Sequence, residues 1–157
     1  MITPMRAVSL AIVFTAVCCA SSMFGTWKMD VSRSKITGSA RPKSFTVRIE
    51  PHSKGEVFTL DRVESDGRAI SSSTVLYFDG APREFEDFGC SGTQSSQRLD
   101  SQTMEILRVC ATGEWTWLIR QSAVKSQELT IDITEKRDGR FNVEWRVVLK
   151  KQEVPNQ

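Results

Sequence analysis

Alternation of apolar and polar residues is the feature that most limits the folds open to this chain. In its clearest run every second residue is apolar, namely Phe141, Val143, Trp145, Val147 and Leu149. Residues 45–50 and 129–134 alternate in the same way. A period of two is typical of a β-strand that buries one face. We therefore expect strands throughout, with one short helical turn at Val31–Lys35.

Turn residues divide the chain into short segments. Asp-Gly pairs stand at Asp66-Gly67, Asp79-Gly80 and Asp138-Gly139, each between segments rich in β-branched and aromatic residues. Asp-Gly accepts the positive φ angles of tight hairpin turns and is a strong hairpin signal. Further strands are predicted at Gly25–Asp30, Glu56–Glu64, Ile70–Phe78, Thr93–Leu99, Thr103–Ala111 and Trp115–Val124.

The segments together predict an all-β fold. We expect an antiparallel up-and-down meander of about 8–10 strands. Such a meander can form a sandwich or a closed barrel. Because closure removes exposed strand edges, we expect the lipocalin-like arrangement of a barrel.

The start of the chain predicts a signal peptide. Met1–Arg6 is short and carries a positive charge, and Ala7–Val17 is an unbroken run of apolar and small residues. Small residues follow, as at a cleavage site, so we expect cleavage after Ala20. Residues 1–20 would then be the leader and residues 21–157 one secreted or periplasmic domain.

Two other interpretations of the leader compete with cleavage. The apolar run has about half of the ~20 residues that a membrane-spanning helix needs. A lipoprotein is the more serious alternative, in which Cys18 or Cys19 would anchor the protein to a membrane. The bulky Val17 that precedes these cysteines fits a lipoprotein signal poorly.

Length and charge limit the classes of partner. The 157 residues have a net charge of +2, and acidic and basic residues are interspersed. A nucleic-acid binder would concentrate its cations on one face, so nucleic acid is not an expected partner. A domain of this size buries roughly two-thirds of its unfolded surface, so it needs no partner to be stable and we expect a monomer.

Cys90 and Cys110 are the two cysteines outside the leader. An isolated pair in an oxidising compartment usually forms a disulfide. Closing a loop of this length stabilises a fold by roughly 3 kcal/mol. A reactive thiol is the alternative, but it would need a histidine nearby, and the chain has only His52.

No catalytic or metal-binding constellation stands out. His52 is surrounded by Pro51, Ser53, Lys54 and Gly55, which indicate an exposed turn. A zinc site would need several ligands with suitable geometry. We therefore expect no metal, no cofactor and no enzymatic activity.

The residues Gly25-Thr26-Trp27 resemble the Gly-x-Trp signature that opens lipocalins and fatty-acid-binding proteins. The wider pattern of Gly25–Asp30, Ser34-Lys35 and Pro42-Lys43-Ser44 looks like a group of secreted bacterial lipocalin-like (calycin-type) β-barrel proteins. That group has similar pieces at Asp66-Gly67-Arg68, Tyr77-Phe78-Asp79-Gly80 and Leu99–Glu105. The resemblance spans nearly all of the mature chain.

The lipocalin resemblance implies a role for Trp27 at the barrel floor, stacked by a cation from the last strand. Arg146 or Arg140 would be the partner, although the alternation turns Arg146 outward. Trp27 as an ordinary core aromatic is the other interpretation. A cation over an indole contributes about 0.5–2 kcal/mol.

The chain also departs from fatty-acid-binding proteins. Only about fifteen residues separate Trp27 from Pro42, too few for the helical lid of that family. The family's Arg-x-Tyr pair near the C-terminus is missing, since Val147 and Val148 follow Arg146. The resemblance therefore implies no fatty-acid function.

Aromatic residues are the remaining candidates for a binding site, namely Tyr77, Trp115, Trp117 and Trp145. Trp115 and Trp117 share a face of their strand. The interior of an eight-stranded barrel is filled by side chains or holds one small ligand. We expect a binding module for a small apolar molecule. The alternative is a protein-interaction or envelope structural domain with a filled barrel, contacting its partner through Phe85–Phe88.

Overall fold

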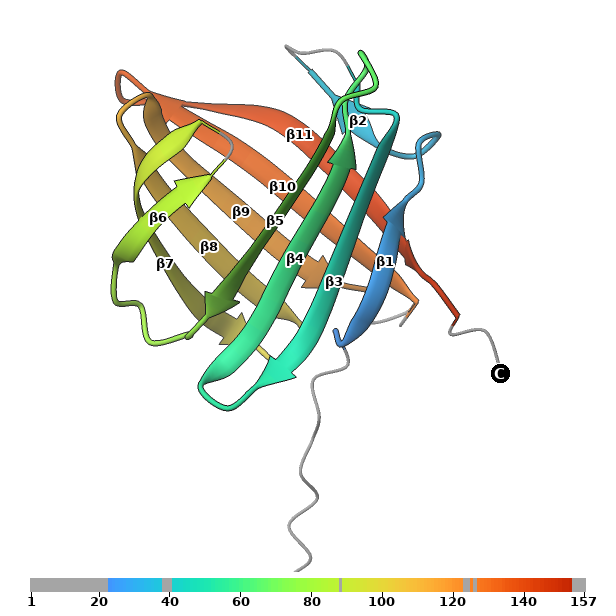
Figure 1. The fold of residues 1–157 in the computed structure, drawn as a ribbon, viewed down its shortest axis with the longest axis horizontal. Helices are drawn as coiled ribbons and strands as arrows, with labels where there is room; N and C mark the ends of the chain where they lie inside the picture. The colour runs from blue at the N-terminus through green and yellow to red at the C-terminus, as the bar shows by residue number, and fades with distance from the viewer. Residues whose placement is uncertain (1–22, 38–40, 88, 123–124, 126, 154–157) are drawn as a thin grey trace, which may run out of the picture.

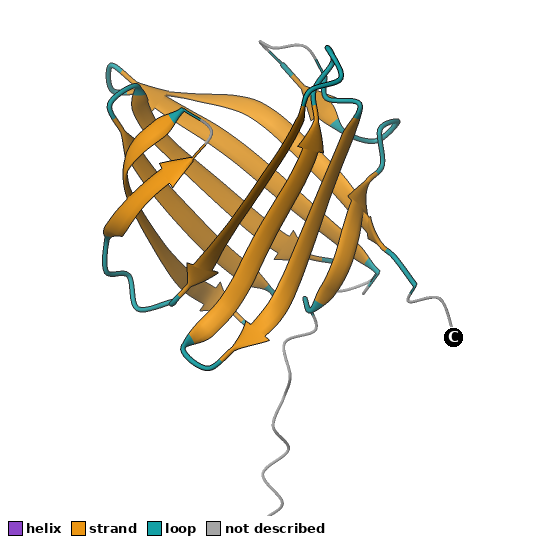
Figure 2. Ribbon diagram, viewed as in Figure 1, coloured by secondary structure: helices purple, strands orange, loops and turns teal. Residues whose placement is uncertain are grey.

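The computed structural model describes residues 23–37, 41–87, 89–122, 125 and 127–153. These residues form strands and turns and include no helix (Figure 2). The strands are β1 (Gly25–Met29), β2 (Lys35–Ile36), β3 (Ser44–His52), β4 (Gly55–Val63), β5 (Ala69–Leu76), β6 (Arg83–Asp87), β7 (Cys90–Asp100), β8 (Thr103–Cys110), β9 (Gly113–Gln121), β10 (Glu128–Arg137) and β11 (Arg140–Lys151). The predicted signal peptide, with Cys18 and Cys19, lies outside the described residues.

The strands form one antiparallel meander that curls into a nearly closed barrel (Figure 1). Their order is β5-β4-β3-β1-β11-β10-β9-β8-β7-β6, and the short β2 pairs with β11. The pairing of β1 with β11 joins the two ends of the chain. The predicted all-β meander is thus confirmed.

The alternation in the sequence sets which side chains face inward. Leu129 pairs with Leu149 and Ile131 with Val147, and all four side chains are fully buried. A one-residue slip of this register would turn the apolar set outward, so burial fixes the pairing. A β-bulge between Ile133 and Thr134 interrupts the register of β10 and β11 toward the turn that joins them.

Two of the three Asp-Gly pairs form hairpin turns. Asp138 and Gly139 have φ angles of 52° and 75°, as a type I′ turn requires, and they join β10 to β11. Asp66-Gly67 joins β4 to β5. The hairpin predicted at Asp79-Gly80 is wrong, because β5 and β6 do not pair and the chain crosses there from one to the other.

Trp27 lies in the fully buried core at the end of the barrel where β1 begins, which we call the floor. Its indole nitrogen donates a hydrogen bond to the Met23 carbonyl at 2.8 Å. Lys151 of β11 holds its ammonium group 5.2 Å from the ring centroid. A cation of the last strand therefore does stack on Trp27, but it is Lys151 rather than Arg146 or Arg140. Arg146 faces outward and binds Asp132 at 2.6 Å.

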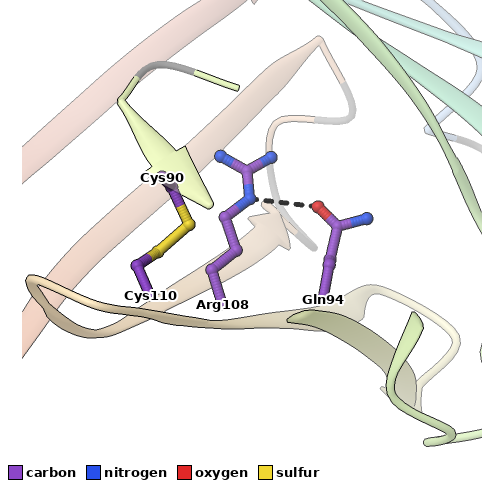
Figure 3. The surroundings of a disulfide bond; sticks show 4 residues. All are labelled: Cys90, Gln94, Arg108 and Cys110. Carbon is purple, nitrogen blue, oxygen red and sulfur yellow. Dashed lines mark hydrogen bonds between the residues drawn. A yellow bond between two sulfur atoms is a disulfide. The ribbon is translucent and has the colours of Figure 1, made fainter. Parts of the chain in front are cut away.

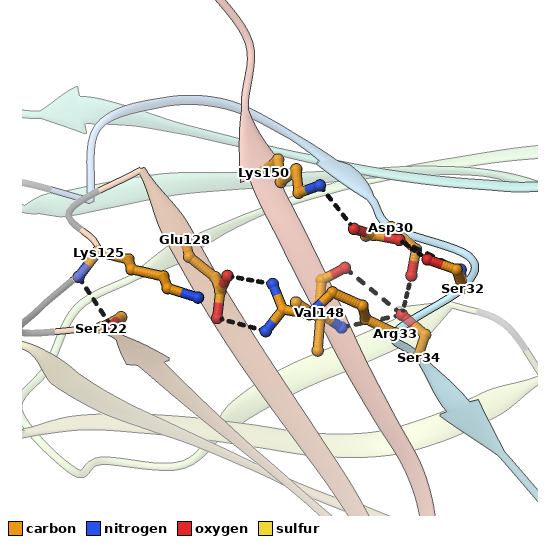
Figure 4. Close-up of polar contacts among 9 residues, drawn as sticks. All are labelled: Asp30, Ser32, Arg33, Ser34, Ser122, Lys125, Glu128, Val148 and Lys150. Carbon is orange, nitrogen blue, oxygen red and sulfur yellow. Dashed lines mark hydrogen bonds and ion pairs between the residues drawn. The ribbon is translucent and has the colours of Figure 1, made fainter.

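A polar cluster on the outer face fixes the turn between β1 and β2 (Figure 4). We call it the clasp, and its members are Asp30, Arg33, Ser34, Glu128 and Lys150. Arg33 donates hydrogen bonds of 2.5 and 3.2 Å to the two oxygens of Glu128. Lys150 pairs with Asp30 at 2.8 Å. The Ser34 hydroxyl donates to the Asp30 carbonyl and accepts from the Val148 amide.

The clasp confirms the short turn predicted at Val31–Lys35, since the Ser34 amide donates to the Asp30 carbonyl at 3.1 Å. It holds this turn against the outer face of β10 and β11. The hydrogen bonds from Lys150 and then Ser32 lower the pKa of Asp30 to about 2. The Arg33 guanidinium lowers the pKa of Glu128 in the same way.

Candidate functional site

A cavity of about 270 Å³ lies inside the barrel, toward the end opposite the floor. The turns β6–β7, β8–β9 and β10–β11 meet at this end (Figure 1). The lining residues are Leu60, Arg62, Asp87, Cys90, Arg108, Cys110, Trp115, Trp117, Ile133 and Trp145. The barrel is therefore packed at its floor and hollow at the opposite end. From the sequence, the interior could be either filled by side chains or open to a small ligand, and the structure has a part of each kind.

One wall of the cavity is aromatic. Trp115 and Trp117 project inward from β9, and Trp145 projects inward from β11. The ring of Trp117 packs edge-on against Phe58, with centroids 6.3 Å apart, and Trp145 packs against Phe45 at 6.4 Å. Edge-to-face pairs of this kind fix ring orientation. The structure thus brings together three of the four aromatic residues predicted for a binding site.

Arg108 is the buried charged residue of the cavity, which Arg62 and Asp87 also line. It follows Met104 and Ile106 on the inward face of β8 and is 5% exposed. Its guanidinium lies between two rings, 4.4 Å from the centroid of Phe85 and 4.6 Å from that of Trp117. Its Nε donates a hydrogen bond of 3.0 Å to the side-chain oxygen of Gln94 (Figure 3).

Burial makes this guanidinium unusual. Desolvation lowers the pKa of Arg108 to about 10, and the charge of Asp87, which also lines the cavity, raises it in part. Among the side chains that the structure describes, none forms an ion pair with Arg108. A buried cation is costly, since burial removes its water, and the charge of Asp87 offsets that cost only in part. It can recover that energy by binding an anion in the cavity.

Arg108 is not among the site residues predicted from the sequence. A signal was available, because Arg108 continues the alternation of Met104 and Ile106 and so stands at an inward position. An arginine at an inward position can also mark the point where a strand leaves the buried core, in which case its side chain would be exposed. The strand pattern alone therefore predicts that the Arg108 side chain points inward, but not that it is buried.

The predicted disulfide between Cys90 and Cys110 is confirmed (Figure 3). The two Cα atoms are 5.2 Å apart, and the bond joins the start of β7 to the end of β8. Both cysteines line the cavity. The disulfide therefore holds the β6–β7 hairpin, and with it Phe85, beside Arg108 at the rim.

Tyr77 lies apart from the other predicted aromatic residues. It follows β5 and lines a second pocket of about 220 Å³, together with Thr74, Val75, Arg83, Glu84, Gln94, Ser95 and Ser96. The Arg83 guanidinium lies over its ring, 3.9 Å from the centroid. Arg83 also pairs with Asp79, which holds the pKa of that carboxyl well below its usual range. We call this second pocket the outer pocket.

The outer pocket lies along a seam in the barrel wall. The sheet path ends at β5 on one side and at β6 on the other, so no backbone ladder joins β5 to β7 within the described residues. Polar groups cross the seam instead. The Gln94 amide donates to the Thr74 hydroxyl at 3.0 Å, the Phe78 amide donates to the Ser96 hydroxyl at 3.1 Å, and Arg98 pairs with Glu56.

Within the described residues, no group of three or more His, Cys, Asp or Glu side chains is placed to hold a metal ion. His52 is the exposed last residue of β3, and its Nδ1 accepts a hydrogen bond from the Lys54 amide in the turn that follows. Of the residues that the structure describes, none belongs to a helix long and apolar enough to cross a membrane.

The barrel is similar to solved structures of fatty acid and bile acid binding proteins. A Schistosoma mansoni fatty acid binding protein in complex with arachidonic acid matches with a TM-score of 0.59 and 11% identity, over 85% of this chain and 98% of that one. Zebrafish ileal bile acid-binding protein complexed with cholic acid matches with a TM-score of 0.54 and 12% identity, over 84% and 100% of the two chains. As-p18, an extracellular fatty acid binding protein, matches with a TM-score of 0.55 and 14% identity, over 84% and 97%.

These structures establish the fold. No protein-family model matches the sequence, and no curated protein matches it significantly. The lipocalin-like barrel implied by the sequence resemblance is thus confirmed at the level of architecture.

Proposed function

We propose that this protein binds one small molecule, with an apolar body and a single anionic group, inside the barrel. Buried Arg108 carries this proposal, since it faces the cavity and has no ion-pair partner among the described side chains. Hydrogen bonds to a charged group contribute about 1.5–3 kcal/mol. An anion bound there would offset the desolvation of the guanidinium.

The rest of the lining suits an apolar body. Leu60, Trp117 and Ile133 are buried and apolar, and they line the cavity with Trp145. A volume of about 270 Å³ lies just below the roughly 300–1,000 Å³ typical of ligand sites, so a small ligand is expected. Arachidonic acid and cholic acid, the ligands of two similar structures, also combine an apolar body with an acid group.

The cellular location is part of the proposal. The leader-like start of the chain and the Cys90–Cys110 disulfide both favour an exported protein, secreted or periplasmic. An extracellular protein, As-p18, is among the similar structures. We infer that the mature chain acts as a monomeric carrier or scavenger outside the cytoplasm.

Native mass spectrometry of the protein purified from its own host tests this function. We expect a discrete extra mass on the folded protein, released on denaturation as an acidic amphiphile. Leu60→Trp should abolish the extra mass because it fills the cavity. Leu99→Trp is the matched control, since Leu99 is 51% exposed, and it should keep the ligand.

A clean apo mass for the wild type would contradict the proposal. It would favour the alternative considered from the sequence, a protein-interaction or envelope structural domain without a ligand. The apolar cavity argues against that alternative, which needs a filled interior.

A further inference from the structure

Gln94 stands between the inner cavity and the outer pocket. It lies on β7 and is 7% exposed. The oxygen and the nitrogen of its side-chain amide bind residues of two different pockets. The oxygen accepts from Arg108, which lines the inner cavity, and the nitrogen donates to Thr74, which lines the outer pocket. One amide side chain is therefore part of the wall between the two spaces.

This part of the wall can open without breaking a ladder between strands. The seam between β5 and β7 has no backbone ladder within the described residues, so moving Gln94 breaks side-chain hydrogen bonds and leaves the sheet intact. The neighbouring side chains, Thr74 and Ser96, are small. Side-chain rotamer changes at binding sites are common even where the backbone moves little.

The outer pocket has different chemistry from the inner cavity. Its lining includes four side chains with a hydroxyl, Thr74, Tyr77, Ser95 and Ser96, and two charged residues, Arg83 and Glu84. The inner cavity is lined by three tryptophans, two aliphatic residues and the two cysteines, with Arg62, Asp87 and Arg108 as its charged residues. Gln94 thus separates a cavity that holds Arg108 and three tryptophans from a largely polar pocket.

We propose that the outer pocket is a second subsite of the same binding site, and that Gln94 is the partition between them. The ligand class is an amphiphile whose single anionic group lies in the middle, with an apolar chain on one side and an uncharged hydroxylated group on the other. The anion binds Arg108, and the hydroxylated group passes Gln94 into the outer pocket. This inference rests on the proposed function of the inner cavity.

A charge-matched pair of probes tests the second subsite. Dodecyl methyl phosphate and dodecyl glyceryl phosphate are both monoanionic phosphodiesters with the same chain, and they differ in the group beyond the phosphate. We expect the wild type to bind the glyceryl diester at least tenfold more tightly, as measured by isothermal titration calorimetry.

A variant that fills the outer pocket supplies the second arm. Ser95 faces outward from β7 and lines that pocket. Ser95→Phe should remove the preference for the glyceryl diester and leave the affinity for the methyl diester within twofold. Gln97→Phe is the matched control, because Gln97 is exposed on the same strand and binds Glu105, and it should keep the preference.

Equal affinities of the wild type for the two probes would overturn the second subsite and leave the proposed function standing. A loss of affinity shared equally by both probes in Ser95→Phe would also overturn it. If neither probe nor any simple fatty acid binds the wild type, the proposed function itself fails.

Discussion

At the scale of single residues, the stacking of Lys151 on Trp27 can be measured as a coupling free energy. Replacing a buried tryptophan by alanine costs about 3–5 kcal/mol, so we expect Trp27→Ala to lower the free energy of unfolding by that amount. Lys151→Met keeps the apolar stem and removes the charge. A double-mutant cycle in urea should give a coupling of about 0.5–1 kcal/mol, the value for a partly exposed cation over an indole.

Lys150 is the control for this cycle. It is the adjacent residue on β11, faces outward and pairs with Asp30. The cycle of Lys150→Met with Trp27→Ala should show no coupling beyond error. An equal coupling for the two lysines would mean that stacking on Trp27 is not specific to Lys151.

The sequence could predict that Trp115 and Trp117 share one face of a strand, but not which cation stacks on Trp27. Trp115 and Trp117 lie two residues apart on a regular strand, and this spacing alone puts them on one face. The cation over Trp27 was predicted on the last strand but assigned to Arg146 or Arg140. Register between strands selects Lys151, since it pairs directly with Trp27, and register is a tertiary property.

At the scale of elements, the clasp should make stability depend on pH. The folded pKa of Asp30 is about 2, below its ordinary value of 3.8. A group with a lowered folded pKa contributes stability that is complete above the ordinary value and is lost as pH falls through the folded value. We expect the stability difference between wild type and Asp30→Asn to be constant above pH 5 and to shrink between pH 4 and about pH 2.

Urea unfolding at a series of pH values measures this difference. Asp66→Asn controls for the removal of a carboxylate, since Asp66 is exposed and its contact with Arg68 is 4.0 Å long. A difference between wild type and Asp30→Asn that stays flat down to pH 2 would show that the charge of Asp30 adds no stability.

The long strands could be predicted from the sequence, whereas β2 and β6 could not. The five residues of β6 include four charged ones, which is typical of a loop. They pair because the following hairpin is tied by the disulfide to β8 and because Phe85 packs on Arg108. The two residues of β2 pair with Trp145 and Arg146 after the clasp fixes the turn before them. Both elements depend on contacts that are distant in sequence.

At the scale of the whole molecule, barrel closure and the cavity depend on all strands together. A meander of strands predicts a barrel, but Asp79-Gly80 has the composition of a hairpin turn while the chain crosses the seam there. The left-handed φ of 58° at Phe78, held by the bond from its amide to Ser96, belongs to this crossing. Such a conformation is rare for a bulky residue, so local sequence statistics favour a simple hairpin.

The central claim is that Arg108 binds the anionic group of a ligand inside the barrel. Dodecanoate and dodecanol share one chain and differ in charge, so calorimetric titration with both measures the anion directly. We expect the wild type to prefer dodecanoate, and Arg108→Gln to weaken dodecanoate binding about 10–100-fold with little change for dodecanol. Arg120→Gln, at an exposed position of β9 that binds Asp132, should behave as wild type. Equal loss of both ligands in Arg108→Gln, or an unchanged preference for dodecanoate, would contradict the account.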